Sequence, residues 1–353
     1  MYDVEGLPAH LRLPTMEGLF FPDGNIILQA ETTIFRLYNG LLASKSTVFK
    51  DMFAFPQPSN EDRTLLGCPV VEIYDNAEEA TYFLRALTDS SYLPPNLPTT
   101  FREVAAVLRL ANKYDVPYLT SLATTHLTSV YPPSLRAWTH RDDNRTIERT
   151  MYLCVAVLSL AREMEGQLEC VLPQVLYACA DGLSVSEIFG GVEFEGGLLE
   201  EHGHSSRREG EGRDRRQTPD GCYNTDDSDS DPHPTRTHHL TISSADQQTL
   251  LRGREELLQA KRTRLYAFLT SLSAGCGAHA CREEKLKCFA KVQWDAIVFD
   301  ENDDFDWRCF EQRVCKRCFT EGRAAFDIAQ DSLWNELPRF FGLPKWEALR
   351  RMQ

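Results

Sequence analysis

The feature that most constrains the fold is a strand-like run that turns directly into two short helical patterns between residues 35 and 53. Phe35 and Leu37 lie on one side of this run, and the second helical pattern carries a one-sided apolar stripe. Ser46 stands just before that stripe, where an N-cap is expected. Helices this short are unstable alone, because nucleating each one costs more than its few hydrogen bonds return. The two helices must therefore pack on each other and on the strand, which predicts a compact α/β interaction domain.

Strand and helix patterns continue to alternate as far as residue 130. A further strand pattern occurs at 25–30, ahead of the constraining stretch. Asn76 and Asp115 each precede an apolar helical stripe, so both are expected to cap a helix. A small sheet followed by paired helices predicts the α+β class for an N-terminal domain over 18–130, after an irregular lead-in over 1–17.

Two separated motifs in this domain resemble the BTB/POZ family. The first motif is carried by Phe35, Leu37, Leu41, Leu42, Ala43, Ser46, Phe49, Met52 and Phe53. The second covers 108–119 and is similar to the closing helices of that family. The sequence departs from the family at Asn25 and Tyr38, where many BTB domains have Asp and His, so the chemistry of their dimer pocket is not carried over. The long C-terminal extension resembles that of a large fungal, basidiomycete-type group of BTB proteins.

The resemblance implies a non-enzymatic role in protein–protein interaction. BTB domains commonly self-associate through their first strand and opening helices, so a homo-oligomer is expected. The residues that would form this surface are Phe35, Leu37, Leu41, Leu42, Val48, Phe49 and Met52. Some BTB proteins recruit cullin-type ubiquitin ligases as adaptors, and others serve transcription. The resemblance therefore implies protein partners, a cullin among them, and leaves a nuclear, transcription-associated regulator with a zinc-stabilised C-terminal module as the alternative.

Beyond residue 130, changes in residue composition and pattern divide the chain into three parts. Helical patterns over 131–189 predict a helical extension of the first domain. Residues 190–244 contain few apolar side chains and cannot bury enough surface to offset their chain entropy, which predicts a disordered polar linker. Helical patterns resume over 245–353, where Trp334 and Trp346 are expected to pack the C-terminal helices together.

Two cysteine pairs carry the strongest chemical signal. Cys276 and Cys281 are followed by Cys315 and Cys318, and two such pairs can surround one zinc ion tetrahedrally. The residues that could substitute for one of these ligands are His279, Cys288 and Cys309. Free buried thiols are the alternative to zinc, and a disulfide is a third reading. With four protein ligands the zinc would have no open position, so it would be a structural clip between helices and not a catalytic ion.

Composition and the absence of known catalytic motifs reduce the number of possible functions. A net charge of −14 opposes an extended nucleic-acid surface, so nucleic acid is not an expected partner. No apolar run reaches the roughly 18 residues of a membrane span, so no membrane association is expected. The eleven cysteines and a start without a signal-like segment favour reduced thiols in the cytoplasm or nucleus. No nucleophile-elbow, phosphate-loop or zinc-protease motif occurs, so no catalytic residue is predicted and the chain is not expected to be an enzyme.

Overall fold

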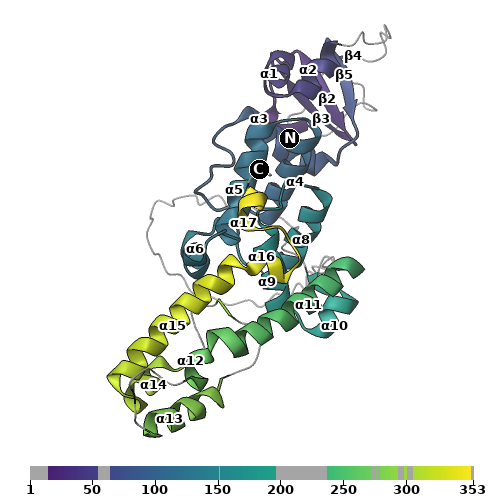
Figure 1. The fold of residues 1–353 in the computed structure, drawn as a ribbon. Coiled ribbons are helices and arrows are strands. Elements are labelled where there is room, and N and C mark those ends of the chain that lie inside the picture. The colour runs from purple at the N-terminus through teal and green to yellow at the C-terminus, as the bar shows by residue number, and fades with distance from the viewer. Residues whose placement is uncertain are drawn as a thin grey trace, which may run out of the picture.

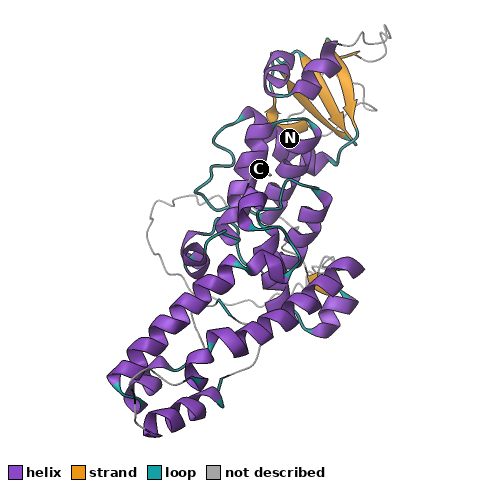
Figure 2. Cartoon of the chain, viewed as in Figure 1, coloured by secondary structure: helices purple, strands orange, loops and turns teal. Residues whose placement is uncertain are grey.

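The computed structural model describes residues 15–54, 64–150, 152–195, 237–271, 276, 279–292, 298–299 and 305–350. These residues form an elongated molecule in three tiers (Figure 1). A sheet with short helices lies at one end, a group of helices occupies the middle, and an arm of longer helices extends to the other end. Strands are concentrated in the first tier, and the other two tiers are mainly helical (Figure 2).

The first tier contains a five-stranded sheet in the order β1-β3-β2-β5-β4. Its strands are β1 (Thr15–Phe20), β2 (Ile26–Ala30), β3 (Thr33–Leu37), β4 (Thr64–Leu65) and β5 (Cys68–Ile73). β2 pairs with β3 in an antiparallel hairpin and with β5 in parallel. Alternate side chains of β3 point to opposite faces of the sheet, so Phe35 and Leu37 enter the main core while Ile34 joins a smaller apolar cluster.

Helices accompany this sheet, which confirms the predicted α+β class. They are α1 (Asn39–Lys45), α2 (Thr47–Ala54), α3 (Ala77–Thr88), α4 (Phe101–Lys113) and α5 (Pro117–Val130). The irregular lead-in expected over 1–17 is wrong for its last residues, because β1 already begins at Thr15; residues 1–14 lie outside the described chain. β1 pairs in parallel with β3, which lies well over ten residues away, and a pairing of that range leaves no local signal in the sequence.

Caps explain where several of these helices begin. Ser46 Oγ accepts a hydrogen bond from the backbone N–H of Phe49 at 3.0 Å, which confirms it as the cap of α2. Asn76 accepts from two backbone N–H groups at the start of α3, as predicted. Asp115 was predicted to cap α5, and this is wrong: the N-cap is Val116, without a side-chain bond. Asp115 instead takes a positive φ of 52° in the tight turn between α4 and α5.

The middle tier is built from short helices that follow the first tier directly. They are α6 (Leu135–Thr139), α7 (Arg141–Asn144), α8 (Leu153–Glu163), α9 (Leu172–Gly182) and α10 (Val185–Gly190). Strands β6 (Val192–Glu195) and β7 (Thr237–Leu240) then form an antiparallel pair. Both strands fall inside the stretch predicted as disordered linker, so that prediction is wrong at its two ends. The remainder, 196–236, lies outside the described residues.

The arm begins with α11 (Ser244–Ala260), which continues through a π-helical turn at Lys261–Leu265. The helices that follow are α12 (Ala267–Thr270), α13 (His279–Phe289), α14 (Trp307–Arg313), α15 (Lys316–Asn335), α16 (Leu337–Phe340) and α17 (Trp346–Leu349). An aromatic cluster fills the space between them and consists of Tyr266, Phe268, Phe305, Trp307, Phe310 and Phe326. Gly322 on α15 permits this packing, since a Cβ there would lie 2.8 Å from Phe268 Cδ2.

The end of the chain returns to the middle tier. Trp334 of α15 packs against Trp138 of α6 with ring centroids 5.6 Å apart, and its Nε1 donates to the Pro133 carbonyl at 3.3 Å. Trp346 stacks on Trp334 and donates to the Trp334 carbonyl at 3.0 Å. The predicted packing role of these two tryptophans is therefore confirmed. These tryptophan contacts also join the arm to the helices that follow the first tier.

Candidate metal centre

Two helix starts bring the four cysteines of the predicted site together. Cys276 lies just before α13, and Cys281 is the third residue of that helix. Cys315 is the N-cap of α15, and Cys318 lies in its first turn. Each pair is thus placed at a helix start, and the packing of α14 between α13 and α15 closes the gap between the two pairs.

The sulfur positions match a tetrahedral metal. All four Sγ atoms lie within 4.8 Å of one another, close enough to bind one metal ion. The Sγ atoms of Cys315 and Cys276 are 3.8 Å apart. A regular tetrahedron with zinc–sulfur bonds of about 2.3 Å places its sulfurs about 3.8 Å apart, so the observed spacing needs little adjustment. Cys281 and Cys318 are buried, Cys276 is half-buried, and only Cys315 is exposed.

Backbone N–H groups favour the thiolate forms that metal binding requires. The N–H of Cys318 donates to Cys315, and this bond, together with bonds from the neighbouring thiols, lowers the pKa of Cys315 to about 7. The N–H of Cys315 in turn donates to Cys281 Sγ at 3.3 Å. That bond favours the Cys281 thiolate, but burial and the adjacent thiols outweigh it, so the pKa of Cys281 is raised. Neighbouring thiolates also repel one another. A bound cation would offset this repulsion and hold all four cysteines as thiolates.

Helix α13 buries few side chains of its own, although Phe289 packs on the core and Glu284 pairs with Arg313 of α14 at 3.2 Å. Its only fully buried side chains are Cys281 and Lys285, so it has no apolar stripe of the kind that docks most helices. Lys285 donates to the Ser271 carbonyl at 3.3 Å. A metal shared with α15 would therefore be a main contributor to the position of α13.

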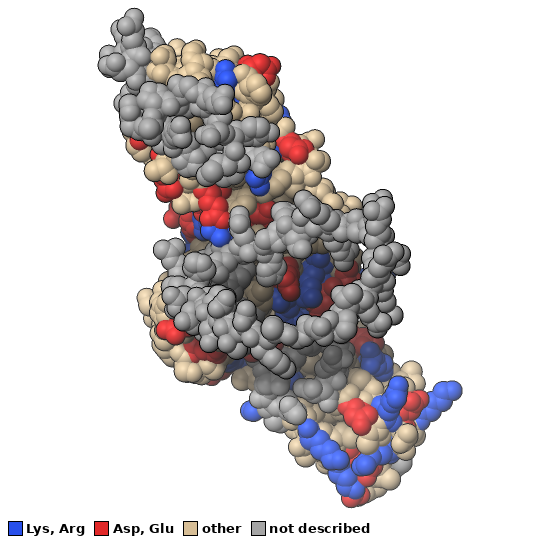
Figure 3. Space-filling view, turned by 180° about the vertical axis from the view of Figure 1, so that it is seen from behind, with Lys and Arg blue, Asp and Glu red and all other residues tan. Residues whose placement is uncertain are grey.

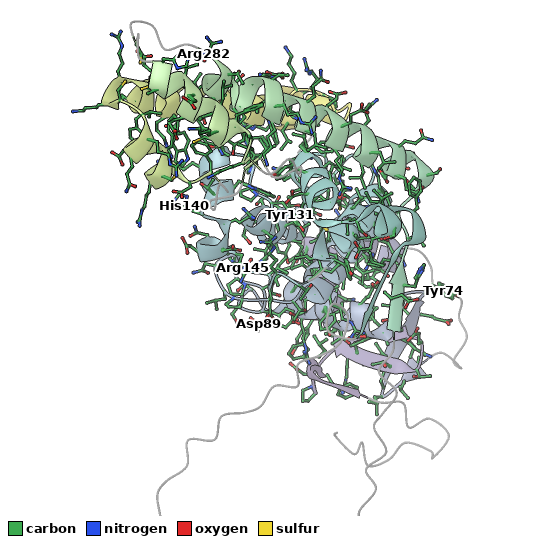
Figure 4. The ribbon with its side chains drawn as sticks, turned by 90° about the horizontal axis from the view of Figure 1, so that it is seen from below. Tyr74, Asp89, Tyr131, His140, Arg145 and Arg282 are labelled. Atoms are coloured by element: carbon green, nitrogen blue, oxygen red, sulfur yellow. The ribbon has the colours of Figure 1, made fainter. Side chains whose placement is uncertain are left out.

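Two arginines lie close in sequence to cysteines of the site. Arg317 follows Cys315 by two residues; its bond to Glu321 raises its pKa, and the negative charges of Cys315 and Cys276 act in the same direction. Arg282, next to Cys281, is exposed at the outer edge of the arm (Figure 4). The far end of the arm shows several Lys and Arg side chains at its surface (Figure 3). These charges complement the net negative charge that four thiolates would retain around a divalent ion.

The three substitute ligands named from the sequence do not join the cluster. His279 is exposed at the first position of α13. Cys288 and Cys309 instead line a separate cavity of about 110 Å³ with Lys287, Lys291 and Arg313. Among the described residues, the predicted set of four cysteines is the one that could hold a metal. Four thiols complete a tetrahedral site, so no substitute ligand is needed.

The residues predicted to form an interaction surface separate into two groups. Phe35, Leu37, Leu42 and Phe49 are fully buried in the protein's own core. Their assignment to an exposed surface is therefore wrong, because the same apolar spacing that suits a partner also suits a core, and sequence cannot distinguish the two. Leu41, Val48 and Met52 are half-buried on α1 and α2 and remain able to contact another molecule.

Comparisons with known proteins assign no relative to this chain. No family model matches the sequence, and a search of curated proteins finds no significant match. The metal centre is thus defined by its geometry alone. None of the described helices is both long and apolar enough to cross a lipid bilayer.

Proposed function

We propose that this chain is a non-enzymatic interaction protein in which a BTB/POZ-like first tier associates with proteins and a zinc clip stabilises the arm. The observation that carries the proposal is the order of elements from β2 to α5, which is the order expected from the resemblance: a hairpin, two short helices, a further strand and then paired helices. Leu41, Val48 and Met52 supply the apolar surface for self-association, which makes the protein a homo-oligomer.

The zinc clip would be structural and would not by itself make the chain an enzyme. Four thiols around one ion leave no position for water or substrate, and zinc in such a site is structural. Zinc is favoured over other metals because a tetrahedral set of four thiolates suits it, although an iron would accept the same ligands. In this proposal the clip keeps α13 and α15 together and so gives the arm a fixed outline for a second partner.

The partner class implied by the resemblance is a cullin-type ubiquitin ligase, for which the chain would act as an adaptor in the cytoplasm or nucleus. The first tier would bind the ligase, and the arm would be free to bind a protein delivered to it. The alternative, a transcription-associated regulator that contacts DNA through the arm, is less well supported. Several of its cations are paired with acids: Lys287 and Arg313 with Glu284, Arg317 with Glu321, and Arg323 with Asp327.

Two measurements on the full chain test the proposal. Light scattering at micromolar concentration should give the mass of an oligomer, and Val48→Asp should convert it to a monomer while Ile328→Asp should not. Ile328 is the matched control because it is an exposed apolar residue on α15. A monomeric wild-type chain removes the self-association part.

Elemental analysis separates the clip from free thiols. About one zinc per chain is expected, and Cys318→Ser should abolish it. Cys309→Ser should retain the metal, because Cys309 is a half-buried cysteine outside the cluster. A metal-free protein purified without chelator, or equal metal in both variants, overturns the zinc clip.

A further inference from the structure

A cavity of about 320 Å³ lies where the first tier meets the middle tier. Its walls come from the end of α5, the chain from α6 to the start of α8, and the end of α9. We name it the junction cavity, and the side chains that determine its chemistry are Trp138, Arg141, Arg145, Arg149, Thr150 and Tyr177. Ligand sites occupy about 300–1,000 Å³, so this volume suits a small molecule. Tyr131, which also lines the cavity, lies inside the molecule, whereas Arg145 lies toward its edge (Figure 4).

One wall of the junction cavity is cationic. Three arginines line it against two aspartates, Asp142 and Asp181, an excess of one positive charge in a chain whose net charge is −14. Arg145 contacts Asp142 at 3.0 Å, but both side chains are solvent-exposed, and an exposed pair of this kind is weak. Arg149 makes no hydrogen bond or ion pair within the described part of the chain. Its guanidinium is thus available to an anion that enters the cavity.

Aromatic rings supply an apolar surface beside these charges. The Trp138 ring is buried and meets the edge of Tyr177 at 5.6 Å. The guanidinium of Arg141 stacks over Trp138 with 4.2 Å to the ring centroid and donates to the Trp138 carbonyl at 2.7 Å. Stacking fixes the plane of that guanidinium beside the cavity and lowers the entropy lost when an anion binds.

One unpartnered hydroxyl and the start of a helix complete the cavity. Thr150 Oγ1 is shielded from solvent and has no hydrogen-bond partner among the described residues. Helix α8 begins at Leu153, and its first N–H groups already have acceptors: Leu153 N–H donates to the Thr150 carbonyl at 3.3 Å and Val155 N–H to the Tyr152 carbonyl at 2.9 Å. The N-terminus of an eleven-residue helix carries a partial positive charge, so it adds to the attraction for an anion.

We propose that the junction cavity binds a small organic anion. Its carboxylate or phosphate group would lie against Arg145 and Arg149, within reach of the Thr150 hydroxyl, and its aromatic or aliphatic body would lie beside Trp138 and Tyr177. Arginine suits this role because its planar fork donates two parallel hydrogen bonds to either group. The site lies in a different tier from the four thiols, so it is independent of the zinc clip, and its location between two tiers means that ligand binding would stiffen their contact.

Calorimetric titration of the full chain with phenyl phosphate tests this proposal. Saturable binding of one molecule per chain is expected at low ionic strength with a Kd of about 1 mM or below. Arg149→Ala and Arg145→Ala should each weaken it by about tenfold or more, because each removes a charge-assisted hydrogen bond. Arg136→Ala is the matched control, since Arg136 is exposed on α6 and does not line the cavity. Phenol, which has the ring without the anion, should bind far more weakly than phenyl phosphate.

A second readout places the ligand in the cavity. Cys154 lines it at the second position of α8, and a hydrogen bond from Cys179, assisted by nearby backbone N–H groups, lowers the pKa of the Cys154 thiol. Phenyl phosphate should therefore slow the alkylation of Cys154 by iodoacetamide, measured by peptide mass, and leave the rate at the distant Cys309 unchanged.

Three outcomes would overturn the proposal. They are the absence of saturable binding by phenyl phosphate up to about 10 mM, binding that survives in the Arg145→Ala/Arg149→Ala double variant, and binding with no protection of Cys154. Both arginines are exposed, so the variants should fold, and circular dichroism identical to that of the wild type verifies this.

Discussion

Cys315→Ser is the sharpest perturbation of the metal centre, because the structure predicts opposite effects with and without metal. Cys315 is the N-cap of α15, and its sulfur is only a weak acceptor for the N–H of Cys318. Serine is a favoured N-cap and should stabilise the metal-free helix by about 0.5–1 kcal/mol. The same change removes one of four metal ligands. Loss of a residue that merely supports a ligand costs about 10–100-fold in affinity, so loss of a ligand itself should cost at least about 100-fold, or roughly 2.8 kcal/mol.

The assay is amide hydrogen exchange of the full chain, since a molecule with three tiers has no single free energy of unfolding. With zinc, the amides of α13 and of the first turn of α15 should exchange about 100-fold faster in Cys315→Ser than in the wild type. With a chelator, the variant should exchange at the same rate or more slowly. Cys309→Ser is the control and should behave like the wild type in both conditions. Equal protection of Cys315→Ser and wild type in zinc would refute the reasoning.

Three further predictions concern the protein core and its caps. Ser46→Ala should destabilise the first tier by about 1–2 kcal/mol, because it removes the cap of α2 and leaves the Tyr114 carbonyl without the hydrogen bond that Ser46 donates at 2.6 Å. Gly322→Ala should destabilise the arm by about 1–2 kcal/mol, since its Cβ would overlap Phe268 by more than the gain in helix propensity repays. Burial raises the pKa of Glu103, but hydrogen bonds from a tyrosine and two threonines outweigh this and lower it from 4.5. The stability it contributes is therefore present above pH 4.5 and lost as the pH falls through the lower folded pKa, and Glu103→Gln should remove this dependence.

Urea denaturation followed separately in the first tier and the arm measures these effects. Unchanged stability in Ser46→Ala would mean that water replaces both hydrogen bonds. A stabilised Gly322→Ala variant would mean that the aromatic cluster can shift. An acid transition that is identical in Glu103→Gln and the wild type would show that other carboxylates control it.

Local signals in the sequence predicted the local features of the structure. Ser46 and Asn76 cap their helices because a cap needs only a side-chain oxygen and the next few N–H groups. The four cysteines were identifiable for a related reason: short spacing within each pair limits how the sulfurs can be arranged. The prediction that Asp115 caps α5 is wrong because the geometry of the turn overrides the capping preference of the side chain. That geometry is set by the packing of α4 on α5.

Features that depend on distant partners could not be predicted in this way. β6 and β7 are separated by 41 residues, so the sequence near either strand does not indicate that the two strands pair. The junction cavity unites residues from α5 to α9, and no spacing rule links Arg149 to Tyr177. The burial of Phe35 and Phe49 is likewise decided by which elements cover them.

The contact between Trp138 and Trp334 has a consequence for the order in which the protein is made. The two rings are separated by 196 residues of chain, which a ribosome adds in about 10–40 s. Throughout that interval the apolar side of α6 that Trp334 will cover faces water or a chaperone. Newly synthesised copies would thus remain vulnerable to aggregation until Trp334 has been added and can reach α6, and copies truncated before Trp334 would never escape that state.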